Sequence, residues 1–230
     1  MNSSAADVGD WAARLLENPD LTRMGHLQRV EDANLGLGWI YYALARVIRT
    51  RTIVVIGSYR GFVPLVFARA LTDNLEGGRV VFIDPSLVDD FWKDPKAVRE
   101  YFSGFDANNI EHFLGTTQEF ARSEAYRSLE RVGIVFIDGY HSEEQARFDY
   151  ETFKDRLGAD GVTLFHDSAR CHISRIYGPD RPYECRVKCF IDQLRLDASV
   201  EVFDLPFDQG VTMVRRRDLR DTETTGETSR

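Results

Sequence analysis

The sequence contains few cysteines, and their arrangement excludes two common uses of that residue. Among 230 residues there are three, Cys171, Cys185 and Cys189. An odd number of cysteines in a chain with no recognisable export signal argues against a disulfide framework. Together with His172 they match no usual zinc-ligand spacing. We therefore interpret the cysteines as free thiols.

Clustered basic residues and long apolar runs are also missing. Acidic side chains outnumber basic ones by 37 to 29, which gives a formal net charge of -8. Binding to a nucleic-acid backbone requires clustered Lys and Arg, so we expect a small molecule or a neutral glycan instead. No apolar run approaches the roughly 18 residues of a membrane span, and the first residues have no basic segment followed by an apolar core. We expect a cytoplasmic protein with no membrane partner.

The length and the order of patterns predict one domain in three parts. Residues 1–50 are predicted to be a helical lid or substrate segment, with helices near 10–17 and 35–49 and a polar, mobile entrance between them. Residues 51–216 are predicted to be the catalytic core. Residues 217–230 are polar and lack apolar periodicity, so we expect a disordered tail.

Within the core, buried strand patterns alternate with helical ones, which indicates a parallel sheet with helices on both faces. Two further strands near the C-terminus are separated by a turn too short for a crossover helix, so they must form an antiparallel hairpin. The prediction is an α/β, Rossmann-like fold with a mostly parallel seven-stranded sheet. Its strands are expected at 52–57, 79–84, 110–115, 132–138, 162–167, 200–207 and 211–217.

A glycine turn follows the first strand. Gly57 and Gly61 permit a tight backbone and the close approach of a ligand, and with Ser58 they precede a helix whose start presents free N–H groups. The G-x-x-x-G spacing, with Tyr59 in the middle, disfavours a pyrophosphate lying on the loop. Taken alone, the turn fits a plain connection equally well.

Asp84 ends the second predicted strand. A carboxylate at this position is placed to accept both hydroxyls of a ribose, although it would also suit a cap of the turn before Pro85. Combined with the glycine turn, Asp84 predicts a bound adenosine.

Two carboxylates end neighbouring predicted strands. Asp138 follows the fourth strand and Asp167 the fifth, so both should converge above one edge of the sheet. Because they would repel each other, a hard divalent cation is expected between them, with His166 as a third ligand. His141 lies three residues beyond Asp138, where an imidazole can face a substrate hydroxyl as general base.

These stretches resemble a known family. TIVVIGSYRGFVPLVFARAL (52–71), RVVFIDPS (79–86) and the IDGYHS to FHDS stretch (137–168) are similar to the class I S-adenosylmethionine (SAM) dependent O-methyltransferases that act on small molecules with magnesium. The branch that it most resembles contains macrolide-sugar and mycobacterial mannoside enzymes. The resemblance covers roughly residues 52–215.

The resemblance implies SAM and Mg²⁺ or Mn²⁺ as cofactors and a sugar or glycan hydroxyl as acceptor. It implies that Asp138 and Asp167 bind metal, that His141 is the base, and that the glycine loop and Asp84 hold SAM. Thr116 and Asp138 complete the predicted cofactor contacts.

Two departures from the family pattern leave alternatives open. Val55 stands where an acidic residue usually contacts the cofactor, which would suit a non-catalytic SAM-binding subunit. His166 stands where a carboxylate is usual, which puts the preference for magnesium in doubt. A catechol-type acceptor would suit the metal equally well. A nicotinamide oxidoreductase is disfavoured by the hairpin and by the acid pair, and the apolar helix at 35–49 could form a homodimer contact.

Overall fold

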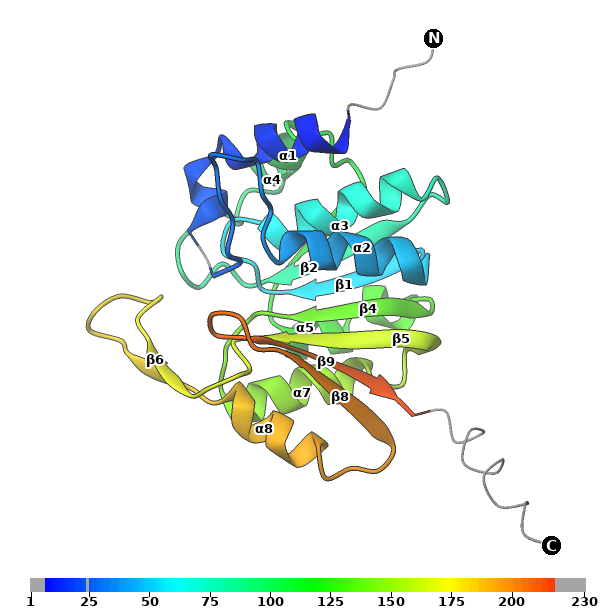
Figure 1. Ribbon diagram of the computed structural model, residues 1–230, viewed down its shortest axis with the longest axis vertical. Coiled ribbons are helices and arrows are strands. Elements are labelled where there is room, and N and C mark those ends of the chain that lie inside the picture. Colours follow the sequence, from blue (N-terminus) through cyan, green and yellow to red (C-terminus); the bar gives the residue numbers. More distant parts are fainter. Residues whose placement is uncertain (1–6, 24, 218–230) are drawn as a thin grey trace, which may run out of the picture.

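The computed structural model describes residues 7–23 and 25–217. A seven-stranded sheet in the order β3-β2-β1-β4-β5-β9-β8 forms its centre (Figure 1). The first five strands pair in parallel, whereas β9 pairs antiparallel with both β5 and β8. The predicted fold is confirmed. The sheet strands are β1 (Thr52–Ile56), β2 (Arg79–Asp84), β3 (Ile110–Leu114), β4 (Val132–Ile137), β5 (Leu157–His166), β8 (Val200–Leu205) and β9 (Val211–Arg216).

Helices cover both faces of the sheet because the central strands are apolar on both sides. In β1, Ile53 and Val55 contribute to one hydrophobic core, which includes α1 to α4. Val54 and Ile56 contribute to a second core with α5, α7 and α8. The helices are α1 (Val8–Leu16), α2 (Gly38–Ile48), α3 (Phe62–Asp73), α4 (Pro95–Ser103), α5 (Thr117–Arg122), α6 (Glu124–Arg127), α7 (Glu143–Phe153) and α8 (Val187–Leu194), with a short 3₁₀ turn at Pro19–Thr22.

The N-terminal segment is packed against the first core. Trp11 and Leu35 are buried there, and Leu21 and His26 are only 1% and 2% exposed. Leu21 and His26 belong to the polar stretch for which a mobile entrance was predicted, so part of that stretch is buried, whereas its Leu27 and Val30 are 47% and 55% exposed. The described part of residues 1–50 contains one isolated β-bridge, between Arg29 and Asn34. It contains no strand of two or more paired residues. Its role as a lid stays a prediction.

The hairpin of β6 (His172–Ser174) and β7 (Tyr183–Cys185) was not predicted. Its strands have three residues each and pair antiparallel outside the main sheet. The hairpin projects beyond the sheet at the left of Figure 1. The sequences HIS and YEC are too short and too polar to show strand periodicity.

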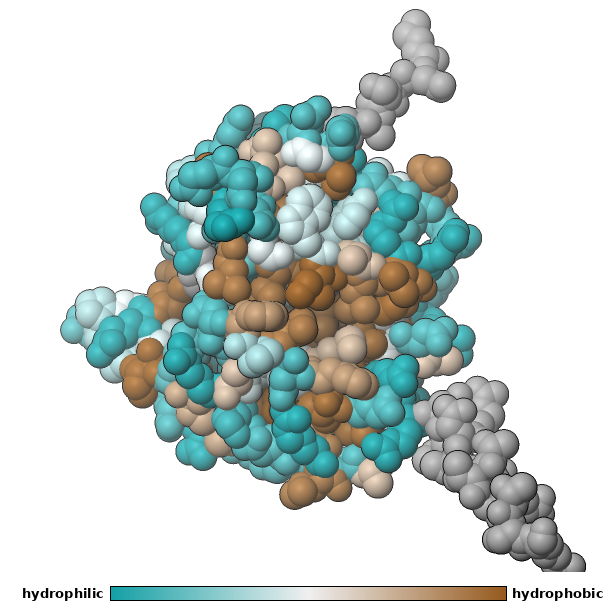
Figure 2. Space-filling view, viewed as in Figure 1, coloured by the Kyte–Doolittle hydropathy of each residue, from teal (hydrophilic) through white to brown (hydrophobic). Residues whose placement is uncertain are grey.

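One face of the molecule carries an apolar band. Figure 2 shows it across the middle of the view, where α2 lies in Figure 1. On α2, Ile40 is 38% and Val47 78% exposed. The expectation of a homodimer contact through this helix stays a prediction. Within the described ranges no helix is long and apolar enough to cross a membrane, and all of the predicted tail except Arg217 lies outside them.

Candidate active site

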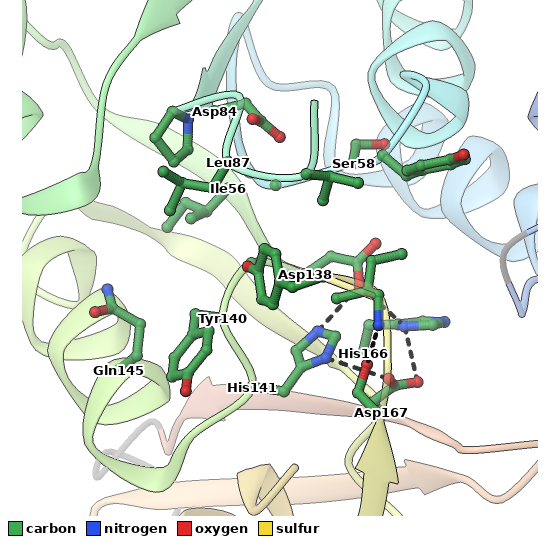
Figure 3. Close-up of a pocket in the computed structure, with 18 of the residues that line it drawn as sticks. Ile56, Ser58, Asp84, Leu87, Asp138, Tyr140, His141, Gln145, His166 and Asp167 are labelled. Carbon is green, nitrogen blue, oxygen red and sulfur yellow. Dashed lines mark hydrogen bonds and ion pairs between the residues drawn. The ribbon is translucent and has the colours of Figure 1, made fainter. Parts of the chain in front are cut away.

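A cavity of about 620 Å³ opens at the carboxyl edge of the parallel strands. Its walls come from the residues that follow β1 to β5, from the N-terminal segment and from the β6–β7 hairpin. Ligands of open α/β sheets bind at this edge, and the volume suits a small-molecule site. Figure 3 shows Ser58 and Asp84 on one side of the cavity and the Asp138, His141, His166 and Asp167 side chains on the other.

The glycine turn lies where β1 and β4 end side by side. Gly57 has φ 72°, and a Cβ built on it would lie 2.4 Å from the carbonyl oxygen of Asp138. The Asp138 N–H in turn donates to the Ile56 carbonyl at 2.8 Å. Gly61, with φ 85°, precedes the first residue of α3. Only glycine fits at Gly57, so the turn is built for close backbone approach at the cavity wall.

Asp84 faces the cavity from the end of β2. One carboxylate oxygen accepts from the Ser86 N–H at 2.7 Å. Burial raises the pKa of Asp84 to about 6, although hydrogen bonds from the Ser86 and Ser58 backbones counteract that rise. The carboxylate therefore keeps acceptor capacity for a ligand but loses its charge in mildly acidic solution.

Thr116, which was predicted to contact the cofactor, lines the cavity at the start of α5. Its hydroxyl already takes part in a capping box: it accepts from the Glu119 N–H at 3.2 Å and donates to the Glu119 carboxylate at 2.9 Å. The Thr116 side chain is thus engaged in holding α5.

The imidazoles of His141 and His166 lie between the carboxylates of Asp138 and Asp167. His141 Nε2 is 3.3 Å from Asp138 Oδ1, and His141 Nδ1 is 3.2 Å from Asp167 Oδ2. His166 Nδ1 is 3.0 Å from Asp138 Oδ1 and 3.1 Å from Asp167 Oδ1. Dashed lines mark these contacts in Figure 3. The structure therefore brings together the residues that the sequence assigned to metal and base.

This convergence depends on the backbone at the end of β5. Asp167 has φ 53°, a left-handed conformation that is rare for residues other than glycine. The next residue is fixed in place, since the Ser168 N–H donates to the Gly210 carbonyl at 3.3 Å and its hydroxyl lies 2.8 Å from that of Thr212. Such a conformation costs about 1–3 kcal/mol.

The four groups strongly shift one another's protonation. Burial opposes the charged forms, but the contacts outweigh it. The histidines hold the pKa of Asp138 well below its usual range, and that of Asp167 is lowered in the same way. The carboxylates raise the pKa of His141 to about 10 and that of His166 well above its usual value.

The residues present fit a metal ion. His141 Nε2 and His166 Nδ1 are buried and have no hydrogen-bond partner among the described residues, although carboxylate oxygens lie nearby. One donor atom each from Asp138, His141 and His166 lies within 4.8 Å of the others, and His141, Asp167 and Cys185 form a second such group. His141 belongs to both groups, and among the described residues the predicted ligand set of Asp138, His166 and Asp167 does not itself form such a group.

Sequence reasoning missed two other histidines at this site. His26 reaches it from the N-terminal segment, with its ring centroid 4.6 Å from that of His166. Burial, and then the charge of His166, lower the pKa of His26 to about 3, so it is neutral. His172, on β6, lies 3.5 Å from Asp167 Oδ2. Neither residue has a motif around it, so only the fold could place them there.

An aromatic wall and a buried acid were missed as well. Tyr140 stacks on Tyr183 at 4.4 Å between ring centroids, and Tyr177 lies beside both. All three line the cavity. Asp149, on α7, is fully buried beside Gln145, whose amide donates to it at 2.7 Å. Burial raises the pKa of Asp149 to about 7, and hydrogen bonds from Thr117 and Gln145 counteract the rise.

Fold and site together define a Rossmann-like α/β protein of the methyltransferase class, with its glycine turn after β1 and its carboxylates and imidazoles at the ends of β4 and β5. Residues 54–168, half of the chain, match the family described as methyltransferase domain, and the chain belongs to that family. No curated protein sequence matches it significantly.

Solved methyltransferase structures share the fold over nearly the whole chain. An S-adenosylhomocysteine-bound methyltransferase from Podospora anserina is 21% identical, with a TM-score of 0.60 over 95% of this chain and 89% of the other. An O-methyltransferase from Bacillus cereus is 16% identical, with a TM-score of 0.63 over 94% of this chain and 93% of the other. The O-methyltransferase of tomaymycin synthesis from Streptomyces achromogenes is 17% identical, with a TM-score of 0.60 over 95% of this chain and 92% of the other.

Proposed function

We propose that this protein is a SAM-dependent O-methyltransferase that methylates a hydroxyl of a small molecule, with a sugar or glycan as the acceptor class. The observation that carries the proposal is the arrangement of one cavity. A glycine turn and a ribose-type acid lie on one side, and two carboxylates with an imidazole base lie on the other. Three solved methyltransferases with this fold carry SAM or its demethylated product, or act on oxygen, according to their descriptions.

The cofactor half of the cavity suits an adenosine-containing methyl donor. SAM supplies a methyl group that is activated by its sulfonium sulfur. Asp84 would accept hydrogen bonds from the ribose, and the Gly57 turn would lie against the methionyl part, where no side chain intervenes. Val55 is fully buried in β1 and offers no acid to the cofactor's amino group. That contact must come from other groups or be absent.

The chemical half suits activation of a hydroxyl. Asp138, Asp167 and His166 would hold a divalent cation, which supplies Lewis-acid polarisation of the acceptor oxygen. His141 would take the hydroxyl proton as the oxygen–methyl bond forms and the methyl–sulfur bond breaks, with that electron pair left on sulfur. As long as both carboxylates act on it, His141 is protonated. His141 can therefore act as a base only where the charge of these carboxylates is compensated.

The acceptor would enter from the side of the β6–β7 hairpin. Tyr140, Tyr177 and Tyr183 line that part of the cavity, and Tyr140 is 44% exposed. Aromatic faces with a polar hydroxyl suit the mixed apolar and polar faces of a sugar ring. A catechol ring could stack there as well, so the test must include both acceptor classes.

The test is a methyl-acceptor screen with isotope-labelled SAM. Glycosides, free sugars and catechols are offered in parallel, each with added Mn²⁺ or Mg²⁺ and with excess EDTA. We expect EDTA-sensitive label on a sugar hydroxyl. A separate calorimetric titration with SAM and with NAD⁺ should give binding of SAM alone.

Each part of the proposal has its own contrary result. If only catechols were labelled, the proposed acceptor class would be wrong, but the proposed reaction would stand. Turnover that persists in excess EDTA would remove the metal. Tight SAM binding with no transfer to any acceptor would favour a non-catalytic SAM-binding subunit.

A further inference from the structure

From the donor atoms at the Asp138–Asp167 centre, we infer that it selects a nitrogen-binding first-row transition ion, of the manganese-to-zinc series, over magnesium. The inference rests on the proposed function only in placing a cation at this centre. It concerns which ion the chain's own residues favour.

The donor set mixes oxygen with nitrogen. Asp138 and Asp167 contribute carboxylates, and His166 Nδ1 lies 3.0 and 3.1 Å from one oxygen of each. His166 is 6% exposed, and its Nδ1 has no hydrogen-bond partner among the described residues. A buried imidazole nitrogen aimed between two carboxylates completes a site with two oxygen sources and one nitrogen.

The other edge of the His166 ring explains why Nδ1 is available. His166 Nε2 lies 3.4 Å from the Gly25 carbonyl oxygen, which can only accept a hydrogen bond. This contact favours a proton on Nε2 and a lone pair on Nδ1. On the same side, the His26 ring packs against His166, with 4.6 Å between the two ring centroids. The N-terminal segment therefore orients the imidazole as an outer-shell support.

More nitrogen and sulfur surround the centre. His172 Nε2 is 3.5 Å from Asp167 Oδ2, and Cys185 Sγ is 3.9 Å from His141 Nδ1. His26, His141, His166 and His172 are four of the five histidines in the chain. Magnesium prefers a nearly regular shell of oxygen ligands and keeps several waters, whereas imidazole suits zinc, iron, nickel and related ions. The imidazole nitrogens and the thiol sulfur around this centre are donors that magnesium uses poorly.

The test compares affinities rather than activities. Metal-stripped protein is titrated calorimetrically with Mg²⁺, Mn²⁺, Co²⁺ and Zn²⁺, as wild type and as His166→Asp, which restores an oxygen donor. Most sites bind Co²⁺ more tightly than Mg²⁺, so the informative quantity is the Co²⁺-to-Mg²⁺ affinity ratio. We expect this ratio to be at least about 10-fold lower in His166→Asp, because even changes to the groups around a ligand alter metal affinity by about 10- to 100-fold.

A second readout observes the nitrogen directly. X-ray absorption of the Co²⁺-loaded wild type should contain imidazole scattering, which should weaken in His166→Asp and in the neutral variant His166→Asn. His112→Asn is the control, because His112 lies on β3 and does not line the cavity. Circular dichroism verifies that each variant is folded, and His166→Asn serves if the extra charge of His166→Asp prevents folding.

Three outcomes would overturn the inference: an unchanged affinity ratio with unchanged imidazole scattering, Mg²⁺ bound as tightly as Co²⁺ by the wild type, or no metal bound at all. None of them removes the methyltransferase proposal, since SAM binding and methyl transfer are measured separately. Conversely, an imidazole-dependent metal preference in a protein that methylates no acceptor would uphold the inference and end the proposed function.

Discussion

His166 and Asp167 are consecutive in the sequence, yet His166 Nδ1 lies 3.1 Å from Asp167 Oδ1. Successive side chains of a strand point to opposite faces of a sheet. Here β5 ends at His166, and the left-handed backbone of Asp167, with φ 53°, turns its carboxylate back toward the imidazole. Both side chains thereby reach the same cavity and meet the groups that follow β4.

The cofactor half of the site can be tested at Asp84. We expect Asp84→Ala to weaken SAM binding more than tenfold, because the ribose would lose a charged acceptor. Isothermal titration calorimetry measures the affinity. Asp90→Asn is the control, since Asp90 is exposed and pairs with Lys93. Equal affinities in wild type and Asp84→Ala would remove Asp84 from the cofactor site.

The same residue predicts how cofactor binding depends on pH. Burial raises the pKa of Asp84 to about 6, so its carboxylate is charged at pH 7 and neutral at pH 5. SAM affinity should therefore be constant above pH 7 and fall below pH 6 by up to about tenfold per pH unit, the limit for one proton. Asp84→Asn should bind weakly at every pH. An affinity that rises on acidification would contradict the role of a charged acceptor.

Substitution of His141 tests whether this residue is a general base or a metal ligand. We expect His141→Ala to keep SAM and metal binding while turnover of the acceptor found in the screen falls about 100- to 10,000-fold, as loss of a general base does. Stopped assays with labelled SAM measure the rate, and His112→Ala is the control for loss of an imidazole outside the cavity.

Two other results would reassign His141. Joint loss of metal affinity and turnover, with rescue by added metal, would make it a ligand. A folded, metal-replete His141→Ala protein with more than about a tenth of wild-type turnover would show that it is not the base.

Gly57 and Gly77 form a matched pair for testing the cofactor turn. Their φ angles are 72° and 70°, but a Cβ at Gly57 would lie 2.4 Å from the Asp138 carbonyl, whereas nothing lies within 4 Å at Gly77. Gly77→Ala should lower the free energy of unfolding by about 1 kcal/mol, from the backbone conformation alone. Gly57→Ala should add a steric cost of about 1–3 kcal/mol and weaken SAM binding. Urea unfolding measures both, and equal losses would mean that β1 and β4 separate easily.

The alternation of apolar strands with helices was enough to predict the sheet, because burial on both faces requires near-continuous apolar runs such as TIVVI and VGIVFI. The short turn after β8 likewise required an antiparallel hairpin. Asp84, Asp138 and Asp167 could be assigned to one edge because parallel strands end at the same side of a sheet. For these features local sequence and topology are sufficient.

Only the tertiary structure decided which imidazoles besides those of His141 and His166 lie near the carboxylates. His26 comes from the N-terminal segment and His172 from a hairpin of two three-residue strands, and neither has local periodicity or a motif. Tyr183 and Tyr140 stack on each other in the cavity wall although they are far apart in the chain. Contacts of this kind depend on how loops pack against a finished sheet. A sequence pattern records the burial and backbone geometry of its own element, and it holds no information on which distant loop will lie beside it.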